Sequence, residues 1–203
     1  MSKQKMNLPN KLTVLRLLLV PAFVVVMMLP GSHIVPMARD IIGASIFILA
    51  ALTDLLDGKI ARKQHLVTDF GKLMDPLADK FMVIGALTVI VYRYDNVRWL
   101  FIWALLLVVF RELAVTSIRL VAAASKEQVV VPANILGKIK TVLQIVCVCA
   151  TIIEPLLYQI PFLKFLSPYL PITYTTCILM MIFTLWSGVN YIVSMWKYLD
   201  PEK

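Results

Sequence analysis

The feature that most constrains this chain is a series of six long apolar runs that together occupy most of its 203 residues. The runs lie near residues 12–30, 39–60, 72–93, 97–123, 135–154 and 170–197. A run of about 20 apolar residues is long enough for one helix to cross the hydrocarbon core of a bilayer. We therefore expect an all-α integral membrane protein with six transmembrane helices, built as a single domain over residues 1–203.

Basic residues are distributed unevenly between the two ends of these predicted helices. With six spans both termini lie on one side, and fifteen of the 20 Lys and Arg residues fall on that side or at its helix ends. Only Arg39, Arg93, Arg98 and Lys164 lie on the other side, with Arg111 inside a helix. Because basic residues are retained on the cytoplasmic side, we expect both termini to be cytoplasmic, in the cell membrane. Much of the net charge of +8 then faces anionic lipid, and we expect no nucleic-acid partner.

Carboxylates are concentrated in one short stretch, which holds five aspartates in the 26 residues 54–79. Asp54 and Asp57 are three residues apart near the cytoplasmic end of the second predicted helix, and Asp75 and Asp79 are four apart near the start of the third. Spacings of three and four place each pair on one helical face. We therefore expect four carboxylates in a polar active-site cavity at the cytoplasmic face. The fifth, Asp69, is expected in a solvated loop or as the cap of the third helix.

Four carboxylates in one cavity repel one another unless cations compensate their charge. A pair of divalent ions would do so, and hard oxygen ligands favour Mg²⁺ or Mn²⁺. No histidine or cysteine belongs to the cluster, which argues against zinc. The alternative is ordinary ion pairing with the neighbouring basic residues Lys59, Arg62, Lys72 and Lys80.

The acidic stretch "DLLDGKIARKQHLVTDFGKLMDPLAD" resembles, without a gap, the signature D-x2-D-G-x2-A-R-x8-G-x3-D-x3-D of the CDP-alcohol phosphotransferases. The positions that match are Asp54, Asp57, Gly58, Ala61, Arg62, Gly71, Asp75 and Asp79. The resemblance implies a membrane enzyme, usually homodimeric, with a two-metal site at the cytoplasmic face. Such an enzyme moves a substituted phosphate from a CDP-linked donor to an alcohol and releases CMP.

Carried over position by position, the resemblance assigns the metal ions to Asp54, Asp57, Asp75 and Asp79, with Asp79 also acting as the general base. It places the nucleotide of the donor beside Asp54, Gly58, Ala61, Arg62 and Gly71. Asn10, Thr13 and Arg16 recur at a spacing of three on the cytoplasmic end of the first predicted helix. They are candidates to bind the cytidine or its phosphates. The alternative is that they serve only as helix-start and topology signals.

Two further segments, "RELAVTSIR" and "GKIKTVLQ", resemble stretches of the phosphatidylglycerophosphate synthases, a branch of the same family, and with the ending "WSGVNYI" the resemblance covers most of the chain. In that branch CDP-diacylglycerol is the donor and glycerol 3-phosphate the acceptor. A dianionic acceptor needs cations, and the two segments supply Arg111, Arg119, Lys138 and Lys140. Glu112, Thr141 and Gln144 are expected to support them, with Glu112 in a salt bridge to an arginine.

The sequence leaves two alternatives open for the function. Another family member, such as a cardiolipin, phosphatidylinositol-phosphate or phosphatidylserine synthase, would share the aspartates and differ in the acceptor pocket. A divalent-cation transporter would also carry carboxylates within the membrane, but its site is expected near the midplane. Here both acidic pairs are expected at one face.

Overall fold

The structure, a computed structural model, describes residues 7–64, 68–124 and 135–196, without the side chains of residues 55, 57–64, 72, 123 and 124. Two short 3-10 helices, Asp95–Val97 and Pro161–Leu166, precede α4 and α6. No β-strand occurs in the described ranges. The six α-helices are α1 Leu8–Met28, α2 Pro36–Gln64, α3 Asp69–Arg93, α4 Arg98–Ala124, α5 Ile135–Leu157 and α6 Pro171–Met195.

Each apolar run in the sequence corresponds to one of these helices, so the all-α prediction is confirmed for the described residues. Five of the helices are long and apolar enough to cross a membrane. The exception is α3, whose first half carries Asp69, Lys72, Asp75, Asp79 and Lys80. That α3 also crosses a membrane therefore remains a prediction. The helix is long enough to cross, but its first half is highly charged.

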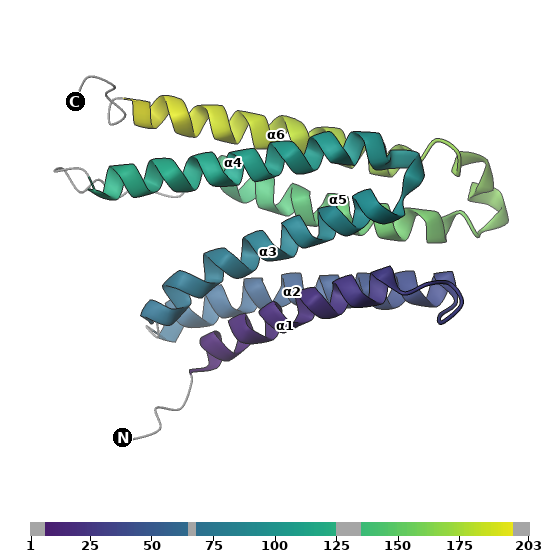
Figure 1. Ribbon diagram of the computed structural model, residues 1–203, viewed down its shortest axis with the longest axis horizontal. Helices are drawn as coiled ribbons and strands as arrows, with labels where there is room; N and C mark the ends of the chain where they lie inside the picture. The colour runs from purple at the N-terminus through teal and green to yellow at the C-terminus, as the bar shows by residue number, and fades with distance from the viewer. Residues whose placement is uncertain (1–6, 65–67, 125–134, 197–203) are drawn as a thin grey trace.

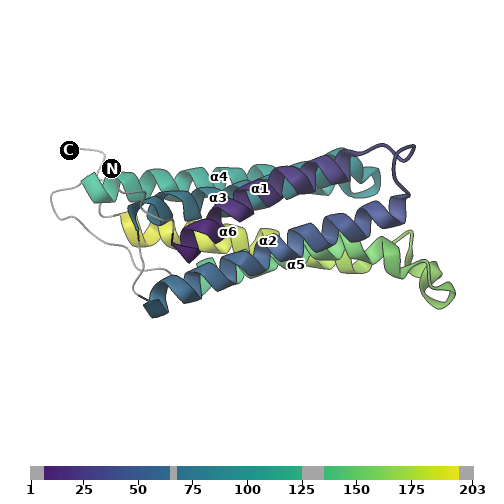
Figure 2. The same ribbon diagram turned by 90° about the horizontal axis from the view of Figure 1, so that it is seen from below.

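Consecutive helices run in opposite directions along the length of the molecule (Figure 1). As a result, the start of α1, the end of α2, the start of α3 and the ends of α4 and α6 lie toward the same end. Helices α1, α2 and α3 pack together, while α6 contacts both α4 and α5. The two groups are joined where α3 contacts α4 and α5 and where α2 contacts α5, as the turned view also shows (Figure 2).

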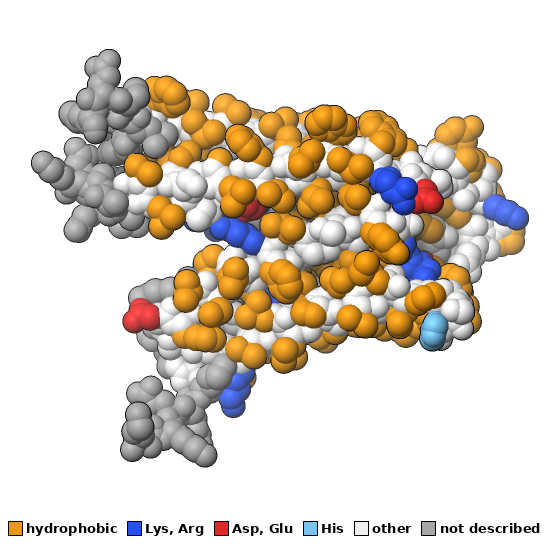
Figure 3. Space-filling model, viewed as in Figure 1, with side chains coloured by type: hydrophobic (Ala, Val, Ile, Leu, Met, Phe, Trp, Pro, Cys, Tyr) orange, Lys and Arg blue, Asp and Glu red, His pale blue; other side chains and the backbone are white. Residues whose placement is uncertain are grey.

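The outer surface of the bundle is apolar over most of its length (Figure 3). Leu18, Leu106 and Val193 are each more than half exposed, while Phe47, Leu87 and Phe101 are fully enclosed. A soluble protein rarely exposes so large an apolar surface, whereas lipid chains cover it without cost. The surface therefore agrees with an integral membrane protein.

A cluster of charged residues joins three helices at the end of the molecule opposite the start of α1. Arg93 on α3 lies 2.7 Å from Asp40 on α2 and also donates to the carbonyl of Met27 at 3.0 Å. Arg39 donates to the carbonyl of Leu29 at 2.8 Å. Both arginines thus bind carbonyls at the C-terminal end of α1, where free carbonyls and the helix dipole favour cations. The cluster fixes the relative positions of the helices that carry the aspartates.

Candidate active site

The carboxylates of α2 and α3 meet on a single arginine of α1. Nη1 of Arg16 lies 2.9 Å from Oδ1 of Asp54 and also contacts Oδ1 of Asp79. The Arg16 side chain is fully buried, whereas those of Asp54 and Asp79 are 26% and 42% exposed. Two carboxylates that are far apart in the sequence therefore share one cation and remain accessible to water. Arg16 does more here than mark topology.

Thr13, one turn before Arg16, contacts the third described carboxylate. Its hydroxyl lies 2.6 Å from Oδ1 of Asp75 and 3.1 Å from the carbonyl of Pro9. The spacing of three that the sequence shows in α1 therefore does place this face of the helix against the aspartates.

The start of α3 is held by Thr68 rather than by Asp69. The Thr68 hydroxyl accepts a hydrogen bond from the amide of Gly71 at 3.1 Å, as an N-cap does, and donates to Oδ1 of Asn10 at 2.9 Å. Asp69 is exposed in the first turn. The prediction that Asp69 caps the helix was wrong, because α3 begins one residue after the threonine, whose side chain serves the same purpose. The other alternative, a solvated loop residue, is correct in its exposure only, because Asp69 is the first residue of α3.

Gly71 leaves space beside the carboxylates. A Cβ added there would lie 3.3 Å from Oδ1 of Asn10 and 3.6 Å from Oδ2 of Asp75. A larger side chain would fill this side of the site. Four of the predicted residues lie on α2 where its side chains are outside the described part of the structure, so their roles stay predictions: Asp57, Gly58, Ala61 and Arg62.

The chemistry of the described carboxylates suits the binding of divalent cations. Oxygens of Asp54 and Asp79 converge on one positive charge, that of Arg16, and carboxylate oxygens are the ligands that Mg²⁺ and Mn²⁺ prefer. Among residues with described side chains, no group of three potential ligands is close enough to hold an ion. Asp57, the fourth predicted ligand, is not among those residues.

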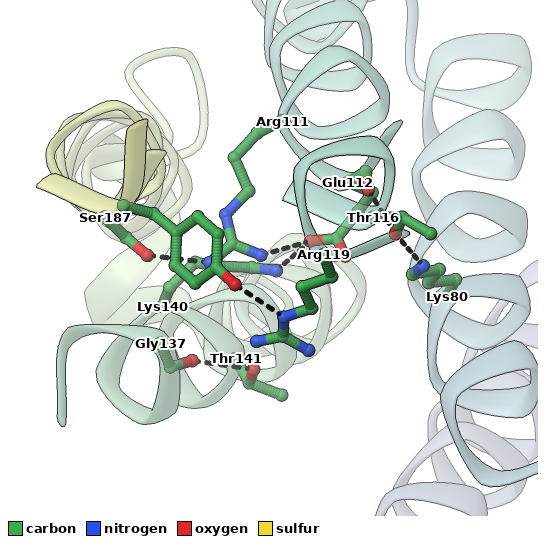
Figure 4. Close-up of polar contacts among 10 residues, drawn as sticks. Lys80, Arg111, Glu112, Thr116, Arg119, Gly137, Lys140, Thr141 and Ser187 are labelled. Atoms are coloured by element: carbon green, nitrogen blue, oxygen red, sulfur yellow. Dashed lines mark hydrogen bonds and ion pairs between the residues drawn. The ribbon is translucent and has the colours of Figure 1, made fainter. Parts of the chain in front are cut away.

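A second polar cluster lies between α4, α5 and α6, with Glu112 at its centre (Figure 4). Its carboxylate contacts Nζ of Lys140 and lies 3.1 Å from Nη1 of Arg111. The opposite side of the Arg111 guanidinium donates to the hydroxyl of Ser187 at 2.8 Å. The predicted salt bridge between Glu112 and an arginine is therefore present, and Lys140, only 5% exposed, is a second partner.

The remaining predicted acceptor residues are less closely grouped. Arg119 donates to the hydroxyl of Tyr191 at 3.1 Å, and its guanidinium lies 5.3 Å from the centre of the tyrosine ring. Lys138 is exposed. Thr141 donates to the carbonyl of Gly137 within its own helix, and Gln144 is buried on α5. Of the four predicted cations, Arg111 and Lys140 thus share one partner, Glu112, whereas Arg119 binds Tyr191 and Lys138 is exposed.

Consecutive residues of α3 reach the two clusters. Asp79 belongs to the acidic cluster, and the next residue, Lys80, donates to the hydroxyl of Thr116 at 2.5 Å. That hydroxyl in turn lies 2.7 Å from the backbone carbonyl of Glu112. The acidic and cationic clusters are therefore neighbours. Figure 3 shows a notch between the helices α1–α3 and α4 that opens at the end of the molecule where α1 starts.

The sequence analysis gave no role in the site to several polar residues of these clusters, namely Thr68, Thr116, Ser187 and Tyr191, and named Lys80 only as a possible ion-pair partner of the aspartates. Two signals were present. Lys80 directly follows the aspartate motif, and Ser187 and Tyr191 are four residues apart, on one face of an otherwise apolar helix. Neither signal says which partner the residue meets.

The described residues thus form an all-helical bundle, five of whose helices could cross a membrane, with an acidic and a cationic cluster side by side within it. The profile of the CDP-alcohol phosphatidyltransferase family matches residues 6–198, nearly the whole chain. The chain belongs to this family of enzymes.

Individual relatives are similar over long stretches. A Bacillus subtilis (strain 168) protein named CDP-diacylglycerol–glycerol-3-phosphate 3-phosphatidyltransferase is 40% identical over 204 residues, covering 97% of this chain and 98% of its own. A Rickettsia typhi protein of the same name is 42% identical over 68% of this chain and 71% of its own. A Mycobacterium tuberculosis (strain H37Rv) protein named probable phosphatidylglycerophosphate synthase is 37% identical over 70% of this chain and 64% of its own.

Proposed function

We propose that this protein transfers the phosphatidyl group of CDP-diacylglycerol to glycerol 3-phosphate, forming phosphatidylglycerophosphate and CMP. The observation that carries the proposal is the adjacency of the two clusters, which Asp79 and Lys80 bring together on α3. An acidic cluster suits a metal-dependent phosphoryl transfer, and a cationic one suits an anionic acceptor. The names of the relatives, which specify this donor and acceptor, support the same substrates.

The donor is expected to bind at the acidic cluster. Asp54, Asp57, Asp75 and Asp79 would hold two divalent cations, Mg²⁺ or Mn²⁺, which when bound supply positive charge to the diphosphate of the donor. Arg16 and Thr13 orient the carboxylates of Asp54, Asp79 and Asp75. Space beside Gly71 would admit the nucleotide, with Asn10, Gly58, Ala61 and Arg62 at its edges.

The acceptor is expected to bind at the cationic cluster. Arg111 and Lys140 both pair with Glu112, so two cations meet one carboxylate there and leave positive charge for a phosphate monoester, to which Arg119 and Lys138 would add. Asp79 then accepts the proton of the attacking hydroxyl. Its side chain is 42% exposed, which gives a substrate hydroxyl access to the carboxylate.

We further propose six membrane crossings, both termini in the cytoplasm, and an active site that opens to the cytoplasm from the cell membrane. The basic residues at the same end as the aspartates support this orientation. A lipid donor then stays in the bilayer while a polar acceptor and CMP exchange with water. The family resemblance also supports a homodimer.

The test is an assay of the purified protein with radiolabelled CDP-diacylglycerol and one acceptor at a time. Glycerol 3-phosphate, glycerol, serine and inositol phosphate are compared, and lipid product and CMP are both measured. We expect CMP release and phosphatidylglycerophosphate only with glycerol 3-phosphate. Equal turnover of another acceptor would assign the protein to a different branch of the family. Absence of CMP release with every acceptor would contradict the proposed reaction.

A further inference from the structure

We propose that α6 forms the specificity-determining wall of the acceptor site, in which Ser187, Gly188 and Tyr191 hold two arginines of α4 in position for a phosphate monoester. The inference rests on the function proposed above and gives a role to residues of α6 to which the sequence analysis assigned none. These are positioning residues, because they act through Arg111 and Arg119.

Two arginines of α4 bind neighbouring residues of α6. Arg111 and Arg119 are eight residues apart on α4, which corresponds to about 12 Å along a helix. Their hydrogen-bond partners on α6, Ser187 and Tyr191, are four residues apart, or about 6 Å. One turn of α6 therefore holds both arginines on the same side of α4. A dianionic phosphate between them would meet both charges.

Gly188 allows Arg111 to lie directly against α6. A Cβ at this position would be 3.2 Å from Cγ of Arg111, tighter than most contacts of a real Cβ. Beyond that contact, Nη2 of Arg111 lies 4.0 Å from the position that a Cβ on Gly137 would take. Glycines on α6 and α5 thus border the same arginine, and its side chain passes between the two helices.

Burial makes these contacts strong and selective. Ser187 and Tyr191 are only 4% and 7% exposed, whereas Trp186 and Val189 on the same helix are more than half exposed. The hydroxyls consequently face the protein interior, and the apolar side chains face outward. A buried arginine has few acceptors to choose from, so the loss of the Ser187 or Tyr191 hydroxyl should leave the orientation of Arg111 or Arg119 less well defined.

The experiment compares steady-state kinetics of Ser187→Ala, Tyr191→Phe and Gly188→Ala with the wild type, varying glycerol 3-phosphate and CDP-diacylglycerol separately. The matched control is Ser194→Ala, because the Ser194 hydroxyl donates to the carbonyl of Tyr191 within its own helix rather than to an arginine. We expect each of the three variants to raise the KM for glycerol 3-phosphate by about 3- to 10-fold, with the KM for the donor unchanged. Ser187→Thr, which keeps the hydroxyl, should restore the wild-type KM.

The outcomes separate this inference from the proposed function. If the wild type does not use glycerol 3-phosphate, the proposed function is wrong. If the wild type uses it but all three variants keep its KM within twofold, the inference alone is wrong. An equal rise in the KM of both substrates would also overturn it, because general loosening of the fold affects both. Gly188→Ala acts on Arg111 by steric contact, whereas the other two variants remove a hydroxyl. A rise in the KM in all three would therefore not depend on a single type of substitution.

Discussion

Arg16 illustrates how a single residue can organise a membrane site. Its side chain is fully buried and contacts the carboxylates of Asp54 and Asp79. A buried charge without partners is costly, and so is a pair of adjacent carboxylates without a cation. Arg16 therefore compensates charges on α2 and α3 from a third helix. Asp79 is the more exposed of the two carboxylates, in agreement with its proposed role as the base.

Replacing this base is expected to separate catalysis from folding. Asp79→Asn should abolish turnover, because an amide cannot accept the proton of the acceptor hydroxyl. Affinity for CDP-diacylglycerol should largely remain, since Asp54 still pairs with Arg16. Turnover and donor binding are measured on the same preparation. Asp69→Asn is the matched control, because Asp69 is exposed in the same helix, and its activity should stay near that of the wild type. Normal turnover of Asp79→Asn would exclude the role.

The two lysines at the start of α5 are expected to differ. Lys140 is buried against Glu112, whereas Lys138 is exposed. Lys140→Gln should raise the KM for glycerol 3-phosphate by about 10- to 150-fold, the range for a lost hydrogen bond to a charged group. Lys138→Gln should have a smaller effect, because its charge is better screened by water. Unchanged kinetics in both variants would show that the acceptor site is elsewhere.

At the scale of elements, α1, α2 and α3 are held together at two levels. Arg16 joins them at the acidic cluster. The cluster of Arg39, Asp40 and Arg93 joins them at the end of the molecule opposite the start of α1. Fixing the helices at two levels keeps the aspartates of α2 and α3 in register. The consequence is that a change far from the site should affect stability more than chemistry.

Asp40→Asn should destabilise the protein by about 3 to 5 kcal/mol, because it leaves the Arg93 charge poorly compensated in a buried position. Unfolding by denaturant in detergent micelles measures the change. The control is Asp95→Asn, which breaks the exposed pair with Arg98 at the same end and should cost about 1 kcal/mol or less. Equal stability of the two variants would mean that the buried cluster does not hold the helices together.

For the whole molecule, the important property is that the two polar clusters are neighbours inside an otherwise apolar bundle. They lie between the middle of the helices and the end of the molecule that carries the start of α1. This arrangement suits the proposed reaction, in which one substrate comes from the bilayer and one from water.

Removing divalent cations is expected to stop the reaction. Exhaustive chelation should abolish CMP release, and added Mg²⁺ or Mn²⁺ should restore it, because the acidic cluster needs cations to bind an anionic diphosphate. Asp57→Ala should stay inactive at every metal concentration. Full activity in the chelated enzyme would contradict the two-metal proposal.

The sequence by itself determined the helices and the candidate carboxylates. Both depend on local properties: a run of about 20 apolar residues can only be a buried or spanning helix, and spacings of three or four place side chains on one face. The motif then indicated the family, which the match over residues 6–198 confirms. Helix boundaries differed by a few residues, chiefly where capping decides them, as at Thr68.

Only the tertiary structure decided which charges meet. Arg16 and Asp79 are 63 residues apart in the sequence, and Arg111 and Ser187 are 76 apart. Helical periodicity indicates that each residue faces inward, but it does not say which helix lies opposite or at what height. The identity and height of the facing helix depend on how the helices pack. Small residues help to set this packing, as Gly188 does where Arg111 lies against α6. For the same reason, the sequence does not distinguish Lys138 from Lys140, whereas in the fold Lys138 is exposed and Lys140 is buried.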